Sequence, residues 1–218
     1  MNPERLDFSQ FTAKSTGKTS PCFRCRAELP CPCTVCEDCQ RKIEHIAWLE
    51  RILSGVPKRF RFLDFERLEG CGWASKQAIA ATQSAQDAPI VVLAGAAGSG
   101  KTSLAAALFR ARIEVVRRGA WMSALELSRC RSITQLGHGE PEMLSLALRT
   151  PLLVLDELPV ADPSGAVRDV MHARYDADLP TIVTTWMDRD VVAAAYGDGV
   201  ARRMWSTDIG AIVIDCSA

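Results

Sequence analysis

The chain has 218 residues and carries equal numbers of basic and acidic side chains, 26 Lys and Arg against 26 Asp and Glu. This balance excludes a strongly basic nucleic-acid footprint over the whole chain, so any contact with DNA needs a local patch. The length allows one α/β domain plus a small module. No stretch approaches the roughly 20 apolar residues that span a bilayer, and residues 1–7 lack a signal-peptide pattern. We therefore expect a cytoplasmic protein without a membrane partner.

A cysteine cluster follows a polar segment, residues 1–20, which we expect to be a flexible tail. Two Cys-x2-Cys pairs have the spacing of a tetrahedral zinc site, and they are formed by Cys22, Cys25, Cys36 and Cys39. Cys31 and Cys33 are surplus to that set; either could replace a ligand, and a six-cysteine two-zinc cluster or an iron–sulfur cluster is an alternative. We predict a zinc-binding module over residues 21–54, since so small a unit needs a metal to fold.

Apolar residues recur at helical spacing over residues 41–54, where Gly55 and Pro57 end the pattern. Residues 55–73 are expected to be a linker that packs onto the next domain. Its run Pro-Lys-Arg-Phe-Arg-Phe, residues 57–62, could alternatively bind nucleic acid by charge and stacking.

Residues 74–218 show strands alternating with helices, which predicts an α/β domain with a parallel sheet covered by helices. We expect strands at 90–94, 120–124, 152–155, 181–185 and 209–214, helices at 74–86, 101–118, 142–149, 164–178 and 188–196, and a polar loop at 128–140. Gly119 is the expected cap of the 101–118 helix, and Asp188 that of the 188–196 helix.

Residues 95–102 read Gly-Ala-Ala-Gly-Ser-Gly-Lys-Thr after an apolar strand, which is a Walker A phosphate loop. Its glycines let the backbone approach the phosphates, and the helix that follows adds the positive end of its dipole. Lys101 is expected to reach the β- and γ-phosphates, and Thr102 to ligate Mg²⁺. The loop residues expected to bind ATP are Gly95, Ala96, Ala97, Gly98, Ser99, Gly100, Lys101, Thr102 and Ser103.

A second motif places two carboxylates after an apolar strand, where α/β sheets bind ligands. Asp156 is expected to complete the Mg²⁺ shell and to contact the nucleotide, and Glu157 to polarise the attacking water as general base. This pairing favours ATP hydrolysis over transfer to a small acceptor. One of Thr184 and Thr185 is expected to orient the water or to sense the γ-phosphate. From the residues alone, Arg202 and Arg203 are most simply a surface charge pair.

The order of these features resembles the DnaC/DnaI-type replicative helicase loaders and the IstB-type transposition ATPases of the AAA+ class. The resemblance covers residues 55–218 and adds the segment Ser-Gly-Val-Pro-Lys-Arg-Phe, the pair Arg174-Tyr175 and an Arg-Met box. It implies an AAA+ fold with little or no C-terminal lid and ATP-dependent self-assembly through the ATPase domain. It also implies contact with single-stranded DNA, and a replicative helicase as the partner that the N-terminal module grips.

The resemblance also assigns roles to single residues. Arg203 falls at the arginine-finger position and would act on ATP bound by a neighbouring subunit, with Arg202 as the fallback. Trp186 stands where these proteins commonly carry a sensor Asn, so Thr185 substitutes for it or hydrolysis is slow. The leading hypothesis is an ATPase that loads a helicase. The alternatives are a transposition helper that delivers a transposase, and a zinc-binding adaptor whose nucleotide site is a switch with negligible turnover.

Overall fold

The computed structural model describes residues 19–30, 35–133 and 139–217, which form two compact units, Met1–Arg51 and Ile52–Ala218. The first unit contains an antiparallel pair, β1 (Thr19–Pro21) and β2 (Glu28–Pro30), and most of helix α1 (Glu37–Ile52). The helix begins four residues before the predicted start at 41. Glu37 and Asp38 lie in its first turn, where carboxylates are stabilised by the helix dipole. Residues 1–18 of the predicted tail and the positions Cys31 and Cys33 lie outside the described residues, whereas residues 19 and 20 of that tail belong to β1.

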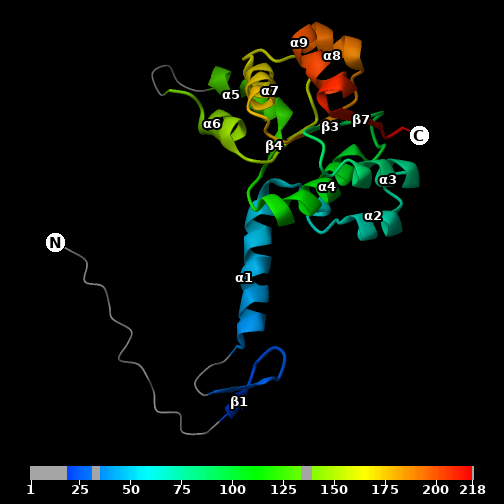
Figure 1. The fold of residues 1–218 in the computed structure, drawn as a ribbon. Coiled ribbons are helices and arrows are strands. Elements are labelled where there is room, and N and C mark those ends of the chain that lie inside the picture. Colours follow the sequence, from blue (N-terminus) through cyan, green and yellow to red (C-terminus); the bar gives the residue numbers. More distant parts are fainter. Residues whose placement is uncertain (1–18, 31–34, 134–138, 218) are drawn as a thin grey trace, which may run out of the picture. The chain divides into compact units, whose positions relative to one another are not determined.

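The second unit is built on a parallel sheet of five strands in the order β4-β5-β6-β3-β7 (Figure 1). The strands are β3 (Ile90–Ala94), β4 (Ala120–Ser123), β5 (Leu153–Asp156), β6 (Thr181–Thr185) and β7 (Ala211–Asp215). The predicted strands at 90–94 and 181–185 are confirmed residue for residue. The strand that ends in Asp156 pairs with the strand that ends in Thr184 and Thr185, as expected for such ATPases.

Helices cover both faces of the sheet, as parallel strands require. One face carries α2 (Phe65–Cys71), α3 (Lys76–Ser84) and α4 (Lys101–Val116) (Figure 1). The other face carries α5 (Ala124–Ile133), α6 (Glu142–Arg149), α7 (Ala166–Asp176), α8 (Arg189–Tyr196) and α9 (Asp198–Trp205) (Figure 1). Three short 3₁₀ segments complete the described elements of this unit: η2 (Leu53–Gly55), η3 (Lys58–Phe60) and η4 (Thr207–Ile209).

Alternating residues of the strands divide between two layers of the core. Ile90 and Val92 of β3 belong to the cluster formed with α5–α9. Val91 and Leu93 between them are also fully buried but lie outside that cluster, in keeping with the period of two along a strand. The helix at 142–149 is confirmed, and Asp188 caps α8 by accepting the Val191 N–H at 2.9 Å, as predicted.

Gly119 does not cap α4, and this prediction was wrong. The left-handed position at the end of the helix is taken by Arg117, with φ 64°. Gly119 is instead required by close packing, because a Cβ there would lie 2.7 Å from Ile113 Cδ1 and 2.8 Å from Phe109 Cε2.

Three helices were missed in the sequence, and one of them, α2, lies in the segment predicted as a linker. Residues 128–133, predicted as part of a polar loop, belong to α5, whose buried face includes Leu127, Ser128 and Cys130. Residues 198–205, where the sequence predicted only a surface pair of arginines, form α9, which buries Val200, Ala201 and Met204. Two glycines, Gly197 and Gly199, masked the apolar spacing of α9, since glycine normally weakens a helix.

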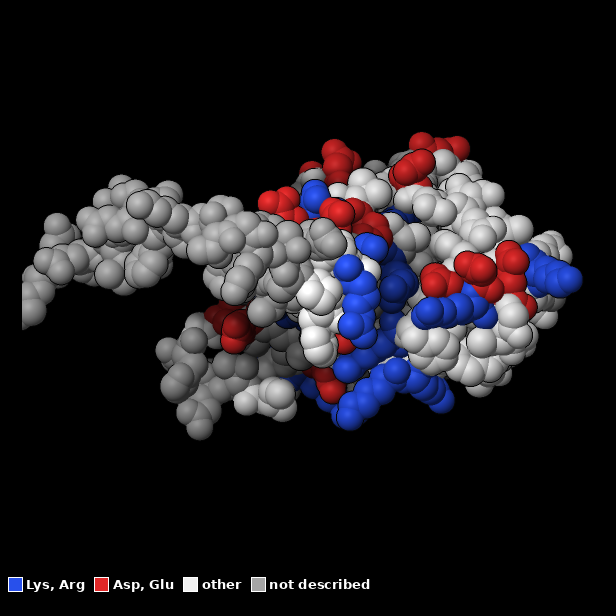
Figure 2. Space-filling model, turned by 90° about the horizontal axis from the view of Figure 1, so that it is seen from below, with Lys and Arg blue, Asp and Glu red and all other residues white. Residues whose placement is uncertain are grey.

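Among the described residues, no helix is both long and apolar enough to cross a membrane. Charges of both signs occur on the surface: Lys and Arg lie beside Asp and Glu on the face that Figure 2 shows. The view therefore adds no argument for a uniformly basic surface.

Candidate nucleotide-binding site

The phosphate loop joins β3 to α4. Gly98 and Gly100 have φ 82° and 86°, a left-handed backbone that glycine adopts without strain. Gly100 also has no room for a side chain, because a Cβ there would clash with the Trp73 carbonyl oxygen. No side chain caps the start of α4 at Lys101. Its first N–H groups and the helix dipole therefore make the loop suitable for an anion.

Hydrogen bonds to neighbouring elements and within the loop hold its predicted residues in place. The Gly95 N–H donates to the Thr185 carbonyl oxygen at 3.2 Å, and the Ala96 N–H donates to Ser217 Oγ at 3.1 Å. Ser103 Oγ donates to the Gly100 carbonyl oxygen at 2.8 Å. Ser99 Oγ is buried and has no hydrogen-bond partner among the described residues.

Lys101 folds back over this loop. Its Nζ donates to the carbonyl oxygens of Gly95 at 2.8 Å and of Ala96 at 2.6 Å. An ammonium group has three donors, so a phosphate could take the third or displace a carbonyl. Lys101 also lines two of the cavities described below.

Asp156 ends β5 and receives two hydroxyl donors on one oxygen. Thr184 Oγ1 donates to Asp156 Oδ1 at 2.7 Å, and Thr102 Oγ1 at 3.2 Å. Burial raises the pKa of Asp156 above its ordinary value, while the hydrogen bonds from Thr184 and Thr102 oppose that rise. A half-buried carboxylate beside a threonine hydroxyl is an oxygen pair that suits Mg²⁺, so Thr102 and Asp156 fit the predicted metal site.

Glu157 follows in a left-handed conformation, with φ 63°. Such a conformation costs on the order of 1–3 kcal/mol for a residue with a side chain, and it is typical of functional positions. The Glu157 N–H donates to Thr184 Oγ1 at 2.7 Å. A single hydroxyl thus joins the backbone of the candidate base to the carboxylate of Asp156.

The two threonines at the end of β6 have different contacts. Thr184 Oγ1 bonds Asp156 and the backbone of Glu157. Thr185 Oγ1 accepts the Met187 N–H at 3.0 Å, and Thr185 lines a cavity with Lys101 and Glu157. From the residues alone the two threonines were equivalent, and the family resemblance favoured Thr185; the link between Asp156 and Glu157 through Thr184 was not predicted.

Three adjoining cavities share Glu157 in their walls, with volumes of 540, 650 and 420 Å³. The 650 Å³ cavity lies between the phosphate loop and residues 57–73. The segment from 57 to 73 contributes Pro57, Arg59, Phe60, Gly72 and Trp73; the loop and its partners contribute Ala97, Gly98, Lys101, Asp156 and Thr184.

Aromatic rings form one wall of that cavity. Phe60 and Trp73 meet edge to face with centroids 5.8 Å apart, and the Arg59 guanidinium lies 4.5 Å from the centre of the Phe60 ring. Trp73 is 41% exposed, so part of its surface is open to a ligand. This segment was predicted to be a linker, and its part in the site was not predicted, although basic and aromatic residues alternate in it.

Comparison with solved structures finds the same architecture in replication proteins. The crystal structure of the DnaC helicase loader matches with TM-score 0.57 and 21% identity, over 72% of this chain and 98% of that one. The replication initiator DnaA bound to AMPPCP and single-stranded DNA matches with TM-score 0.56 and 15% identity, over 73% of this chain and 50% of that one. AMPPCP-bound DnaA from Aquifex aeolicus matches with TM-score 0.52 and 16% identity, over the same shares.

The chain has the AAA+ fold. No protein-family model matches the sequence, and no curated protein matches it. At these identities the structural likeness establishes the fold of this chain but not its activity or its partners.

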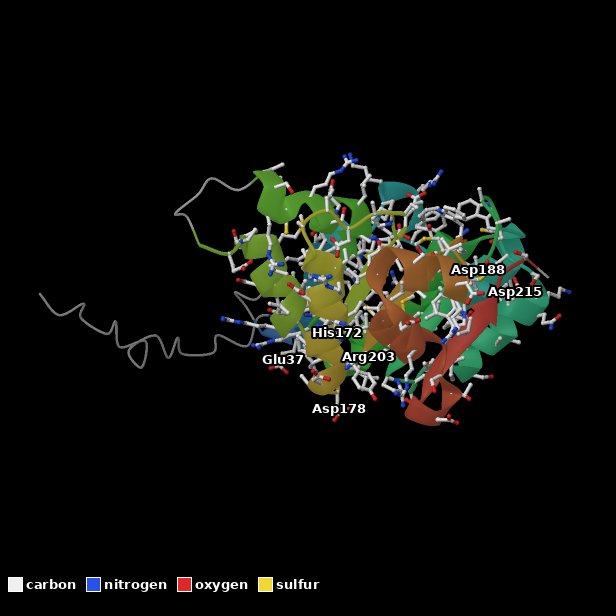
Figure 3. The ribbon with its side chains drawn as sticks, turned by 90° about the horizontal axis from the view of Figure 1, so that it is seen from above. Glu37, His172, Asp178, Asp188, Arg203 and Asp215 are labelled. Carbon is white, nitrogen blue, oxygen red and sulfur yellow. The ribbon has the colours of Figure 1, made fainter. Side chains whose placement is uncertain are left out.

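Arg203 of the AAA+ domain lies on α9, away from the walls of the three cavities. Figure 3 shows Arg203 beside His172, which comes from α7. The Arg203 guanidinium lies 4.6 Å from the centre of the Tyr175 ring, and its Nη2 is 3.5 Å from Asp176 Oδ1. The structure thus does not bring Arg203 to the phosphate loop of its own chain.

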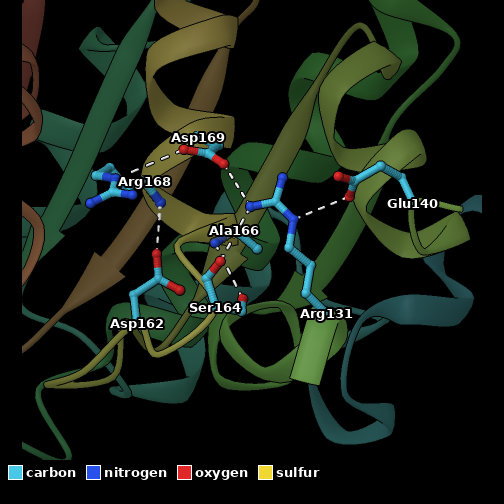
Figure 4. Close-up of polar contacts among 7 residues, drawn as sticks. All are labelled: Arg131, Glu140, Asp162, Ser164, Ala166, Arg168 and Asp169. Carbon is cyan, nitrogen blue, oxygen red and sulfur yellow. Dashed lines mark hydrogen bonds and ion pairs between the residues drawn. The ribbon is translucent and has the colours of Figure 1, made fainter. Parts of the chain in front are cut away.

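The segment that follows Glu157 is anchored by a polar network (Figure 4). Arg131 Nη1 donates to Asp169 Oδ2 at 2.6 Å and to the Ser164 carbonyl oxygen at 3.2 Å, while its Nε donates to Glu140 at 3.1 Å. Asp162 accepts the Arg168 N–H at 2.9 Å. These bonds join α5 to the start of α7 and so fix the chain between them.

In the other unit, the four predicted zinc ligands come together. The sulfur atoms of Cys22, Cys25, Cys36 and Cys39 all lie within 4.8 Å of one another. A tetrahedral site with Zn–S bonds of about 2.3 Å places its sulfurs about 3.8 Å apart, so this cluster fits zinc. Backbone N–H groups of Cys25 and then Cys36 lower the pKa of Cys22 to about 6, whereas the hydrogen bond with the Cys36 side chain and then burial raise the pKa of Cys39 to about 12.

Proposed function

We propose that this protein hydrolyses ATP and loads a replicative DNA helicase onto DNA. One observation supports the assignment as an ATPase. A single cavity at the carboxyl edge of the parallel sheet is lined by Lys101, Thr102, Asp156, Glu157 and Thr184. Binding alone would need the loop and Lys101. Glu157, in its left-handed conformation beside the half-buried Asp156, supplies in addition a base for hydrolysis.

In the proposed reaction, loop N–H groups and Lys101 bind the phosphates, and Trp73 and Phe60 face the base. Thr102 and Asp156 would hold Mg²⁺, which neutralises charge on the transferred phosphoryl group. Glu157 accepts a proton from the attacking water. Thr184 holds the Asp156 carboxylate and the Glu157 backbone in fixed positions relative to each other. Thr185 contacts the water or the terminal phosphate. Arg203 of a neighbouring subunit completes the site, so hydrolysis depends on self-assembly.

The partner assignment rests on likeness of fold to the DnaC helicase loader, together with the order of motifs in the sequence. DnaA, which has the same fold, binds single-stranded DNA in its solved complex. We propose that this chain also contacts single-stranded DNA. The zinc module, proposed over 21–54, would grip the helicase; residues 55–73 and 74–218 would form the ATPase part.

The test is ATP turnover by the full chain, with and without single-stranded DNA. Glu157→Gln is expected to lower kcat by on the order of 10²- to 10⁴-fold while ATP binding persists. Glu69→Gln, an exposed acid on α2, is the matched control. No turnover by the native chain under any condition would contradict the enzyme assignment and leave a nucleotide switch.

The partner is tested by affinity capture from host extract with ATP present. Recovery of a hexameric helicase is the expected result. Recovery of a transposase instead would reassign the protein to transposition.

A further inference from the structure

Arg203 is held by groups from the end of α7 and from its own helix. Its guanidinium lies 4.6 Å from the centre of the Tyr175 ring and 3.5 Å from Asp176 Oδ1, and Nη1 donates to the Gly199 carbonyl oxygen at 3.2 Å. Arg203 Nε is buried and has no hydrogen-bond partner among the described residues. The side chain is 23% exposed. A guanidinium has five N–H donors, so beside the buried Nε this arrangement leaves one N–H on each of Nη1 and Nη2 of a partly exposed side chain.

The support beneath Arg203 is rigid. Arg174, next to Tyr175, is fully buried, and its guanidinium donates to the carbonyl oxygens of Ala147, Thr150 and Pro180 at 2.7–2.9 Å. Arg174 Nε also donates to Thr181 Oγ1 at 2.9 Å. These bonds tie the end of α7 to α6 and to the start of β6. Tyr175 and Asp176 therefore project from a part of the helix that cannot easily move.

We propose that Tyr175 and Asp176 are positioning residues that present Arg203 to the phosphates of ATP bound by a second copy of this chain. The inference rests on the proposed function, in which ATP is hydrolysed between subunits. The contact with the ring and the contacts of Nη1 and Nη2 restrain the guanidinium, and each of these two nitrogens keeps a second N–H that a phosphate oxygen could accept. The cation–ring contact and the carboxylate together limit the positions that Arg203 can take, so less freedom is lost when the subunits meet.

A purely structural role makes a different prediction. If Tyr175 and Arg203 only fasten α9 to α7, removal of the ring lowers thermal stability and ATP affinity along with the rate. A positioning role lowers kcat and leaves the KM for ATP and the melting temperature of the chain nearly unchanged.

The first experiment measures ATPase kinetics of the full chain with Mg²⁺ and single-stranded DNA. Tyr175→Leu and Asp176→Asn are each expected to lower kcat by about 10-fold at unchanged KM. Tyr175→Phe keeps the ring and should recover most of the rate, since the Tyr175 hydroxyl makes no hydrogen bond with any of the described residues. Asp178→Asn, which removes a charge two residues beyond Asp176, is the matched control.

The second experiment mixes subunits. Arg203→Ala protein binds ATP but lacks the arginine, whereas Lys101→Ala protein lacks ATP and keeps the arginine. Their mixture should regain turnover, because each supplies what the other lacks. Lys101→Ala/Tyr175→Leu protein should fail to restore it, and Lys101→Ala/Asp178→Asn protein should succeed.

The outcomes separate the two levels of the proposal. If the native chain does not hydrolyse ATP, the proposed function fails. If it does, but the Tyr175→Leu double variant restores turnover as well as Lys101→Ala alone, the positioning role is wrong and the ATPase stands. A parallel loss of melting temperature and rate in Tyr175→Leu, without rescue by Tyr175→Phe, would likewise overturn it.

Discussion

Thr184 connects the two acidic residues of the candidate site through one oxygen atom. Its hydroxyl donates to Asp156 and accepts the Glu157 N–H, at 2.7 Å in each case. The second bond supports the left-handed backbone of Glu157, which would otherwise be strained. Thr184 is therefore expected to act through its neighbours, whereas Thr185 faces the cavity that Lys101 and Glu157 line.

Thr184→Val removes this hydroxyl and keeps the shape of the side chain. Because a hydrogen bond to a charged group is lost, we expect kcat to fall by on the order of 10- to 100-fold with little change in ATP affinity. Thr82→Val is the control, since the Thr82 hydroxyl bonds the Ala78 carbonyl oxygen within α3. An unchanged kcat in Thr184→Val, with loss in Thr185→Val, would give the leading role to Thr185.

At the scale of elements, the segment 55–73 differs most from its description as a linker. It contains η3 and α2, and its rings close one side of the cavity above the phosphate loop. Short helices such as α2, which has seven residues and buries only Leu68, are too short to show a helical period. The position of α2 depends on its packing against α4, and the sequence gives no sign of that packing.

Trp73→Ala should weaken ATP binding by about 10-fold, because stacking on a nucleobase is lost. Binding of inorganic triphosphate should be unaffected, since the loop and Lys101 remain. Calorimetry with both ligands makes the comparison, and Phe23→Ala, an exposed aromatic of the other unit, is the control. Equal loss for both ligands would show that Trp73 supports the loop itself.

Arg174 joins three elements through a buried guanidinium, and the burial lowers its pKa to about 10. Arg174→Met leaves buried carbonyl groups without donors, so the free energy of unfolding should fall by about 3 kcal/mol. Chemical denaturation measures the change. Arg168→Met is the comparison, because its ion pair with Asp169 is exposed and should be worth less than about 1 kcal/mol. Similar effects of the two variants would contradict the role given to Arg174.

At the scale of the whole molecule, the chain divides between residues 51 and 52 into two units. Each unit is stabilised internally in a different way. The larger unit has a core of apolar strands and helices. The smaller one contains two three-residue strands and most of one helix, and only two residues of α1, Cys39 and Leu49, are buried. Its stability is expected to come from a metal held by the four cysteines.

Metal analysis should find about one zinc per chain, lost in Cys22→Ser and Cys36→Ser and kept in Cys71→Ser, whose cysteine is exposed and apart from the cluster. Chelation should unfold the small unit, because its thiolates are left without their cation. ATP affinity should stay within about two-fold, as expected for independent sites. Loss of ATP binding on chelation would show that the units are coupled, and absence of zinc from fresh protein would refute the metal site.

The sequence by itself determined the features whose chemistry is local. The phosphate loop, the Asp-Glu pair and the two cysteine pairs each need particular residue types a few positions apart, so their patterns predict ligand chemistry directly. Apolar runs likewise predicted the central strands, since parallel strands are buried on both faces. The tertiary structure decided which distant residues come into contact. Examples are Thr184 with Asp156 and Glu157, the aromatic wall of the cavity, and Arg203 against the ring of Tyr175. These contacts join separate elements, and their geometry depends on how helices and strands pack, which no short pattern records.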